Sequence, residues 1–212
     1  MGTTAKAGGT DFPKAPVGTH IARCYQVIDL GHQKIVWQGS EKWQPKVLIA
    51  WELCNEMMTE GEHVGKPFSV SNRYTLSLSE KSNLAPMLEA WRGKKFTVEE
   101  RLGFDIKNVL GHHCMLNVVH NTTDDKTYAN VSAVMALPKG TVRPPAINPD
   151  LYFNLDTDDI GILPEWLQGV VKKSREFVGD TLPAQTKAKD HFADMEDDCP
   201  FDQPYRQTWR FA

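Results

Sequence analysis

Aromatic and cationic side chains are concentrated in one short polar stretch of the sequence, residues 32–46. Its histidine, lysine and tryptophan residues are His32, Lys34, Trp37, Lys42, Trp43 and Lys46. Aromatic rings stack on bases and cations pair with phosphates, so this combination is typical of a surface that holds single-stranded nucleic acid. Packing of Trp37 or Trp43 against the protein interior is the alternative, although the periodicity does not allow both rings to be core.

Two predicted strands add further candidates for the same surface. Arg23 and Tyr25 alternate onto one face of the first strand, where Tyr25 can stack on a base while Arg23 pairs with a phosphate. Arg73 lies on the polar face of the third strand and is a second candidate phosphate contact. A buried Tyr25 and a merely solvated Arg73 are the alternatives. Trp51 and Tyr74 lie on apolar faces, which indicates core positions.

Near its C-terminus the chain carries an acidic run that is closed by a proline and an aromatic ring, residues 195–201. Such a peptide can dock into a basic pocket of a partner, with the ring as its apolar anchor. It can also cover the protein's own basic cleft until a polyanion displaces it. The candidate partner-binding residues are Asp197, Asp198, Pro200 and Phe201. A solvated acidic tail without a partner is the alternative.

Residues that could carry catalysis do not form a convincing set. His112 and His113 are adjacent, so we expect them to point to opposite faces of a strand, and no zinc-type ligand spacing accompanies them. Asp156, Asp158 and Asp159 lie in an apparent linker, without the Glu and Lys on neighbouring strands that a nuclease site uses. The glycine-rich loop that cradles phosphates in ATP-binding proteins is absent from the sequence. We therefore predict a protein that is not an enzyme and uses no metal or cofactor.

Composition and charge are compatible with a polyanion-binding protein. The 212 residues carry a net charge of −3, but residues 14–140 sum to +2 and residues 145–212 to −6. A mildly basic body with an acidic tail is one way for such a protein to be acidic as a whole. Four widely spaced cysteines and an N-terminus without an apolar signal core predict reduced thiols in a cytoplasmic protein. The apolar runs are too short for a transmembrane helix.

The periodicity predicts three strands, a helical insert and two further strands. The expected strands cover residues 17–30, 46–53, 68–78, 114–119 and 128–137. Apolar residues at helical spacing from Leu84 to Trp91, a capping-box pattern at Thr97 and a short turn at 105–110 form the insert. This order is that of a mainly β, five-stranded OB-fold barrel with a helix between strands 3 and 4, although other α+β folds share it.

The chain is divided by composition into four parts. We expect a flexible N-terminus at 1–12, an OB-fold domain at 13–140, a linker with an amphipathic helix at 141–178 and a disordered acidic tail at 179–212. The helix, about residues 164–177, presents Trp166, Val170 and Phe177 for packing onto the body. In an OB-fold the stretch at 32–46 is the loop that flanks the binding face.

Several local runs within residues 13–138 resemble those of phage-encoded single-stranded DNA-binding proteins of the OB-fold type. The runs are at residues 16–18, 22–25, 28–31, 50–53, 74–78, 80–82 and 91–94. The acidic Pro-Phe segment adds to the resemblance, with Cys199 where that family has Ile and eleven residues after Phe201. The resemblance implies a sequence-tolerant protein that coats single-stranded DNA during phage replication or recombination, in the host cytoplasm. It also implies an acidic tail that recruits replication or recombination proteins or inhibits DNA binding.

Two other functions fit the same elements. A structural or assembly protein of a phage particle would use the 32–46 stretch for protein contacts. A nuclease associated with replication is the second, less favoured alternative. The sequence leaves the oligomeric state open.

Overall fold

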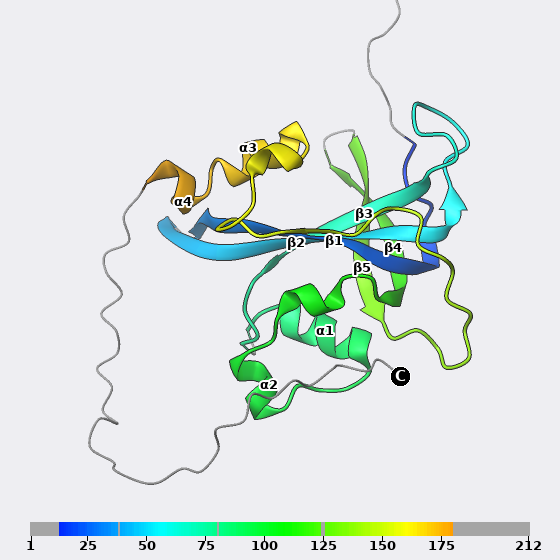
Figure 1. Cartoon of the computed structure of the whole chain (residues 1–212), viewed down its shortest axis with the longest axis horizontal. Coiled ribbons are helices and arrows are strands. Elements are labelled where there is room, and N and C mark those ends of the chain that lie inside the picture. Colours follow the sequence, from blue (N-terminus) through cyan, green and yellow to red (C-terminus); the bar gives the residue numbers. More distant parts are fainter. Residues whose placement is uncertain (1–12, 38, 80, 124–125, 180–212) are drawn as a thin grey trace, which may run out of the picture.

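The computed structural model describes residues 13–37, 39–79, 81–123 and 126–179. The N-terminus at 1–12 and the acidic segment with Asp197, Asp198, Pro200 and Phe201 lie outside these described residues. Figure 1 shows the arrangement of the elements. The strands are β1 Gly18–Trp37, β2 Ser40–Met57, β3 Pro67–Thr75, β4 His113–Thr123, β5 Lys126–Met135 and β6 Leu151–Phe153. The helices are α1 Leu84–Arg92, α2 Val98–Leu102, η1 Ile106–Val109, η2 Ile160–Ile162, α3 Glu165–Val171 and α4 Arg175–Val178.

The strands form one mainly antiparallel sheet in the order β3-β2-β1-β4-β5. Three strands, a helical insert and two strands follow one another as predicted, and the mainly β class is confirmed. β3 and β5 lie at opposite ends of the hydrogen-bonded order, and among the described residues no ladder joins them. The sheet is therefore open between β3 and β5, and the predicted closed barrel is not confirmed. A cavity of about 390 Å³ lies between these two edges, beside α1.

The sheet carries an apolar core on each face. The first core packs the sheet against α1 and includes Trp51 and Trp91, whose ring centroids are 5.9 Å apart. The second core packs the other face against the C-terminal part of the chain and includes Leu48, Phe153 and Leu167. Figure 1 shows α1 and α2 on one side of the sheet and α3 and α4 on the other. The sheet is thus the middle layer of three.

An extra residue in β1 changes which of its side chains face each core. The β1–β2 register shifts between Cys24 and Gln26, which leaves Tyr25 as the additional residue. Because side chains alternate along a strand, a bulge reverses the face to which later residues point. Cys24 and Val27 consequently both belong to the first core, while Ile28 belongs to the second.

β1 and β2 continue beyond the end of β3 as a two-stranded arm, residues 32–37 and 39–45. The sequence pattern predicted a loop for residues 32–46, and that prediction was wrong. Ile35, Val36 and Trp37 have the β-branched and aromatic side chains that favour extended backbone. Gly39 has a φ of 75°, a left-handed value that a tight hairpin turn needs and that glycine adopts without strain. The binding candidates of this stretch therefore stand on paired strands.

The C-terminal extension, residues 151–178, packs on the sheet face opposite α1. It begins with β6, which pairs in parallel with residues 26–28 of β1. The single helix predicted at 164–177 is divided into α3 and α4, because Ser174 is buried and extended between them. Trp166 and Phe177 are exposed instead of packing on the body. Leu167 and Val171 provide the buried face of α3.

The helical insert follows the predicted pattern closely. α1 buries Leu84, Leu88 and Trp91 and ends at Gly93, and the capping box at Thr97 and Glu100 is present at the start of α2. None of the helices in the described ranges has both the length and the apolar character needed to cross a membrane.

Candidate nucleic-acid interface

The arm brings together most of the candidates from the 32–46 stretch. Lys34 lies directly opposite Trp43 in the β1–β2 ladder, and Lys42 lies opposite Ile35. Trp37 is the last residue of β1 and pairs with Ser40. Lys34 and Lys42 are exposed, so their ammonium groups face water. The arm thus carries the Trp43 ring on β2 and an exposed lysine on each of its strands.

Trp43 is partly exposed and is held from one side by the C-terminal extension. The guanidinium carbon of Arg175, in α4, lies 5.9 Å from the centroid of the Trp43 ring, within the range of a cation–π contact. Lys34 forms an ion pair with Glu41 at 2.6 Å, with both side chains exposed. Exposed pairs of this kind contribute little, about 0–1 kcal/mol, so a phosphate can replace the carboxylate at low cost.

The base of the arm meets β3 at a polar surface. Lys46 Nζ donates hydrogen bonds to Thr75 Oγ1 at 2.7 Å and to Gln44 Oε1 at 3.2 Å. Partial burial lowers the pKa of Lys46, but the hydroxyl and amide oxygens that it contacts suit a charged amine. Arg73 lies on β3 two residues from Thr75 and is exposed. Cations of β2 and β3 therefore continue from the arm onto the sheet.

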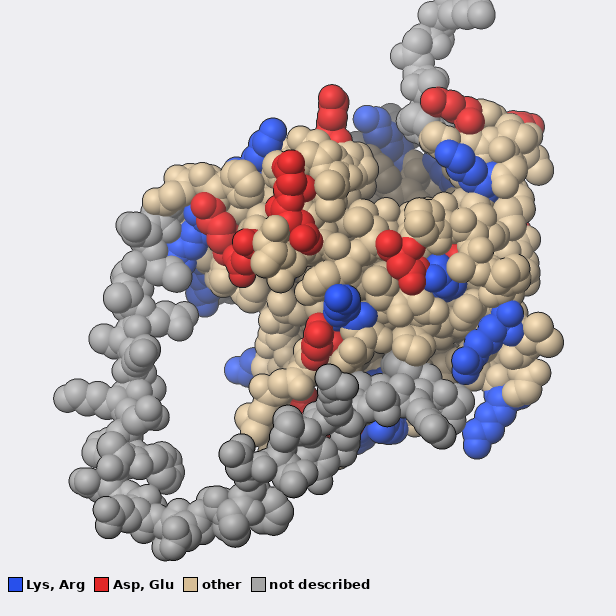
Figure 2. Space-filling view, viewed as in Figure 1, with Lys and Arg blue, Asp and Glu red and all other residues tan. Residues whose placement is uncertain are grey.

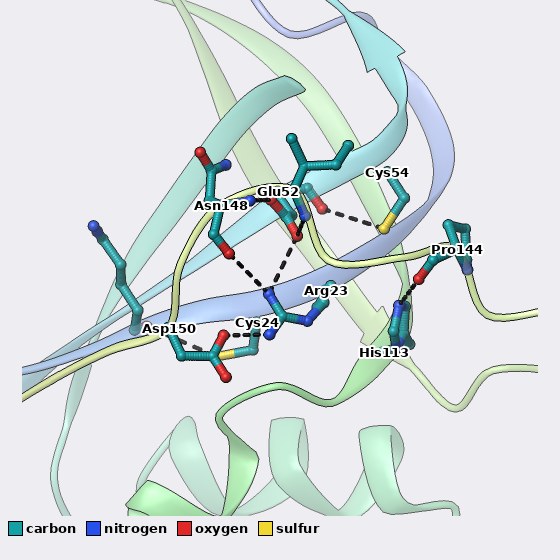
Figure 3. A network of polar contacts seen from close by, with 10 residues as sticks. Arg23, Cys24, Glu52, Cys54, His113, Pro144, Asn148 and Asp150 are labelled. Carbon is teal, nitrogen blue, oxygen red and sulfur yellow. Dashed lines mark hydrogen bonds and ion pairs between the residues drawn. The ribbon is translucent and has the colours of Figure 1, made fainter. Parts of the chain in front are cut away.

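Arg23 lies apart from this surface, in a buried ion network shown in Figure 3. Its guanidinium is 3.2 Å from the Glu52 carboxylate and also pairs with Asp150. The Glu52 carboxylate accepts further hydrogen bonds from the backbone N–H groups of Ile147 and Asn148, at 3.2 and 2.7 Å. Arg23 is only 7% exposed and is directed at internal carboxylates. We correct its expected outward orientation and leave it out of the candidate interface.

Tyr25 is also placed differently from its expected position. As the bulge residue of β1 it packs at the edge of the second core, and its hydroxyl is hydrogen-bonded to Ser69 of β3. Burial raises the pKa of the Tyr25 hydroxyl. Because the Tyr25 ring packs against the second core, little of its surface is available for stacking on a base. Trp51 and Tyr74 are buried, as predicted.

Sequence reasoning missed one further feature, which we call the basic pocket. It has a volume of about 120 Å³ and lies between the end of α1, the start of β4 and the segment after β5. Its titratable lining residues are Arg92, His112, His113, Lys139 and Arg143. His112 and His113 were expected to point to opposite faces of a strand, but His112 precedes β4, and both residues line this pocket. The closely spaced Lys139 and Arg143 were the feature of the sequence that could have indicated this pocket.

Reactive thiols and metal ligands do not form a site within the described ranges. Cys24, Cys54 and Cys114 are free and buried, and burial raises the pKa of Cys54 to about 11, so its thiol is protonated at neutral pH. No group of three or more His, Cys, Asp or Glu side chains in the described part of the chain is arranged to hold a metal ion.

Comparisons with known proteins give no match to this chain, either among protein-family models or among curated proteins. The functional assignment therefore depends on the geometry of the arm, the β2–β3 surface and the basic pocket.

Proposed function

We propose that the protein binds single-stranded nucleic acid, with little sequence preference, along the arm, past Lys46 at its base, and onto the exposed residues of β3. The observation that carries this proposal is the placement of the partly exposed Trp43 directly opposite Lys34 on the two-stranded arm, with exposed Arg73 on the strand beside its base. Stacking on an aromatic ring tolerates any base, because every base has a π-face, and cations track the phosphates. The proposal requires no hydrogen bond that distinguishes one base from another.

The strand order supports a finer proposal for the fold. We infer an OB-fold that is open between β3 and β5, since the order β3-β2-β1-β4-β5 and the helices between β3 and β4 match that architecture. OB-folds bind oligonucleotides on the face of strands 2 and 3 and with the connection between strands 1 and 2. In this proposal the arm corresponds to that connection, which supports the candidate residues as ligand contacts.

The biological role that fits this binding is protection of exposed single strands during DNA replication or recombination, in a phage-infected cell, without catalysis. The acidic segment with Phe201 would then recruit a partner protein or compete with DNA for the cationic surface. Deletion of residues 194–212 removes five acidic and two basic residues. A truncated protein with unchanged affinity for DNA at every salt concentration, and with no partner lost, would exclude both roles of the tail.

Fluorescence anisotropy with a labelled oligo-dT tests the proposal. We expect binding at low salt that weakens as salt rises, because each phosphate contact in a single strand contributes about −0.7 to the slope of log K against log salt. Contacts by Lys34, Lys42 and Arg73 alone predict a slope of roughly −2. Duplex DNA of matched length is the control and should bind more weakly, since its bases are not free to stack. Absence of oligo-dT binding at low salt would refute the proposal.

A further inference from the structure

The basic pocket lies away from the arm, at the end of α1. Its walls come from three separate segments: α1, the chain at residues 111–113, and residues 136–143 after β5. In Figure 2, Lys and Arg side chains gather at the right-hand edge below the middle of the molecule, the region of the 136–143 segment in Figure 1. Asp and Glu side chains are more frequent over the C-terminal extension, at the upper left.

The three walls are fastened to one another by hydrogen bonds. The Trp91 Nε1–H donates to the carbonyl oxygen of His113 at 2.9 Å, and the Ala136 N–H donates to the carbonyl oxygen of Ala90 at 3.0 Å. The His113 ring contacts the carbonyl oxygen of Pro144 through Nε2 at 2.9 Å. These contacts join α1 to β4, α1 to β5, and β4 to the segment after β5. The pocket is therefore formed before any ligand arrives.

A tight turn places Lys139 at the rim. The Thr141 N–H donates to the Pro138 carbonyl oxygen at 3.2 Å, and Gly140 has a φ of 83°. A positive φ at the third residue is the mark of a type II turn, which glycine accommodates without strain. The turn fixes the backbone on both sides of Lys139. Binding of a ligand by its ammonium group therefore costs only the conformational entropy of the side chain.

The lining of the basic pocket is cationic, and within the described residues no Asp or Glu side chain lines it. Arg92 is held at its place by an ion pair with Glu100 at 2.9 Å and by the Phe96 ring, whose centroid is 4.4 Å from the guanidinium carbon. Glu100 offsets the Arg92 charge. Lys139 and Arg143 are exposed at the rim, and no carboxylate lines the pocket beside them.

The pKa values of the two histidines are lowered, mainly by burial. Burial lowers the pKa of His112, and the nearby Arg143 and His113 lower it further. Burial also lowers the pKa of His113, and the charges of Arg23 and Arg143 act in the same direction, against the Pro144 carbonyl and Glu52, which raise it. The Arg143 charge therefore acts on both rings, which places this guanidinium close to the two histidines.

We propose that the basic pocket binds one phosphate group, with Arg143 and Lys139 pairing with its oxygens and His112 at its floor. A volume of about 120 Å³ admits a tetrahedral oxyanion. Arginine presents paired N–H donors that match two phosphate oxygens, and lysine adds a point charge. The phosphate is either a free phosphate ion or one phosphodiester of a bound strand. The proposal goes beyond strand binding at the arm and does not depend on it.

Isothermal titration calorimetry with inorganic phosphate, at low salt in a phosphate-free buffer, tests the free ion. The variant Arg143→Gln/Lys139→Gln should lower the affinity at least about tenfold, a loss of about 1.4 kcal/mol. The control variant Lys172→Gln/Lys173→Gln removes the same charge from exposed positions between α3 and α4 and should change it little. Thermal unfolding of all three proteins establishes that they are folded.

Anisotropy with labelled oligo-dT on the same three proteins tests the phosphodiester. Loss of oligo-dT affinity in the pocket variant, beyond that of the control, supports a phosphodiester of the strand as the ligand. Loss of inorganic phosphate binding alone supports the free ion. In either case the ring resonances of His112, recorded with ¹⁵N-labelled histidine at fixed pH, should shift on addition of the ligand. If the pocket variant and the control bind both probes equally, the proposal is overturned, whether or not the arm binds DNA.

Discussion

The Arg23 guanidinium lies 3.2 Å from the carboxylate of Glu52, directly across the β1–β2 ladder, and Glu52 is completely buried. Glu52 also accepts the backbone N–H groups of Ile147 and Asn148, while Arg23 reaches Asp150. The pair therefore fastens the segment that leads from β5 to β6 onto the sheet. β6 and the C-terminal extension follow directly, so the pair also helps to position α4 beside Trp43.

The first prediction concerns this pair. Arg23→Met should lower the free energy of unfolding by about 3–5 kcal/mol, because it leaves the Glu52 charge buried without its cation. Urea denaturation of the variant and of the parent protein measures the difference. Arg73→Met is the matched control, since the same change at an exposed position should remain within about 0.5 kcal/mol. A loss for Arg23→Met no larger than that for the control would contradict the assigned role.

Trp43→Ala should weaken oligo-dT binding by roughly 1–3 kcal/mol, the usual contribution of one base–aromatic stack. Trp166→Ala is the control, because Trp166 is also exposed but lies on α3, outside the proposed interface. Anisotropy titrations measure both, and circular dichroism shows whether loss of the Arg175 contact has disturbed the fold. Equal affinities for the two variants would remove Trp43 from the interface.

Arg73→Ala should reduce the salt dependence of binding. Loss of one phosphate contact lowers the slope of log K against log salt by about 0.7 for a single strand. Titrations at four or more salt concentrations give this slope for the parent protein and for Arg73→Ala. Lys172→Ala is the control, because Lys172 is an exposed charge at the end of α3, outside the proposed interface. An unchanged slope for Arg73→Ala would identify Arg73 as a solvated surface charge.

The stability of the protein should fall in mildly acidic solution because of His112 and His113. Burial is the main cause of the lowered pKa of both rings, with Arg143 adding to it for each. Below the unfolded-state pKa of about 6.5 the unfolded chain binds more protons than the folded one, so the free energy of unfolding decreases as pH falls. Above that pH the contribution is fully present. Urea denaturation measures the free energy of unfolding at pH 7.5 and 5.5. Its decrease between these pH values should be smaller for His112→Gln/His113→Gln than for the parent protein. An equal decrease in both proteins would assign the effect to other groups.

The elements of the fold were largely predictable because they are local. The alternation of Val70 and Tyr74 with polar residues defined β3, and the Thr97 capping box defined the start of α2. The arm was missed because its many polar residues obscure the β-forming run at 35–37. The gap between β3 and β5 depends on how strongly the sheet curves. The order of the elements does not determine this curvature, so the gap could not be predicted from it.

The site was less predictable because it depends on partners that are distant in the sequence. Arg23 is buried through a carboxylate 127 residues away, Asp150, which strand alternation cannot reveal. The bulge at Tyr25 reverses the faces of residues 26–29, before a second register shift between Asp29 and His32. The basic pocket combines α1 with residues around 112 and 140, so that its cations look unrelated in the sequence.

Intrinsic tryptophan fluorescence during titration with oligo-dT at low salt tests the central claim most directly. Trp51 and Trp91 are buried and shielded from the ligand, whereas Trp43 is accessible on the arm. Stacking of a base on Trp43 predicts saturable quenching in the parent protein, and a markedly smaller signal in Trp43→Phe, which keeps an aromatic ring. Full quenching in Trp43→Phe would assign the signal to another tryptophan and remove Trp43 from the interface. No quenching in the parent at saturating oligo-dT would contradict a single-strand interface on the arm.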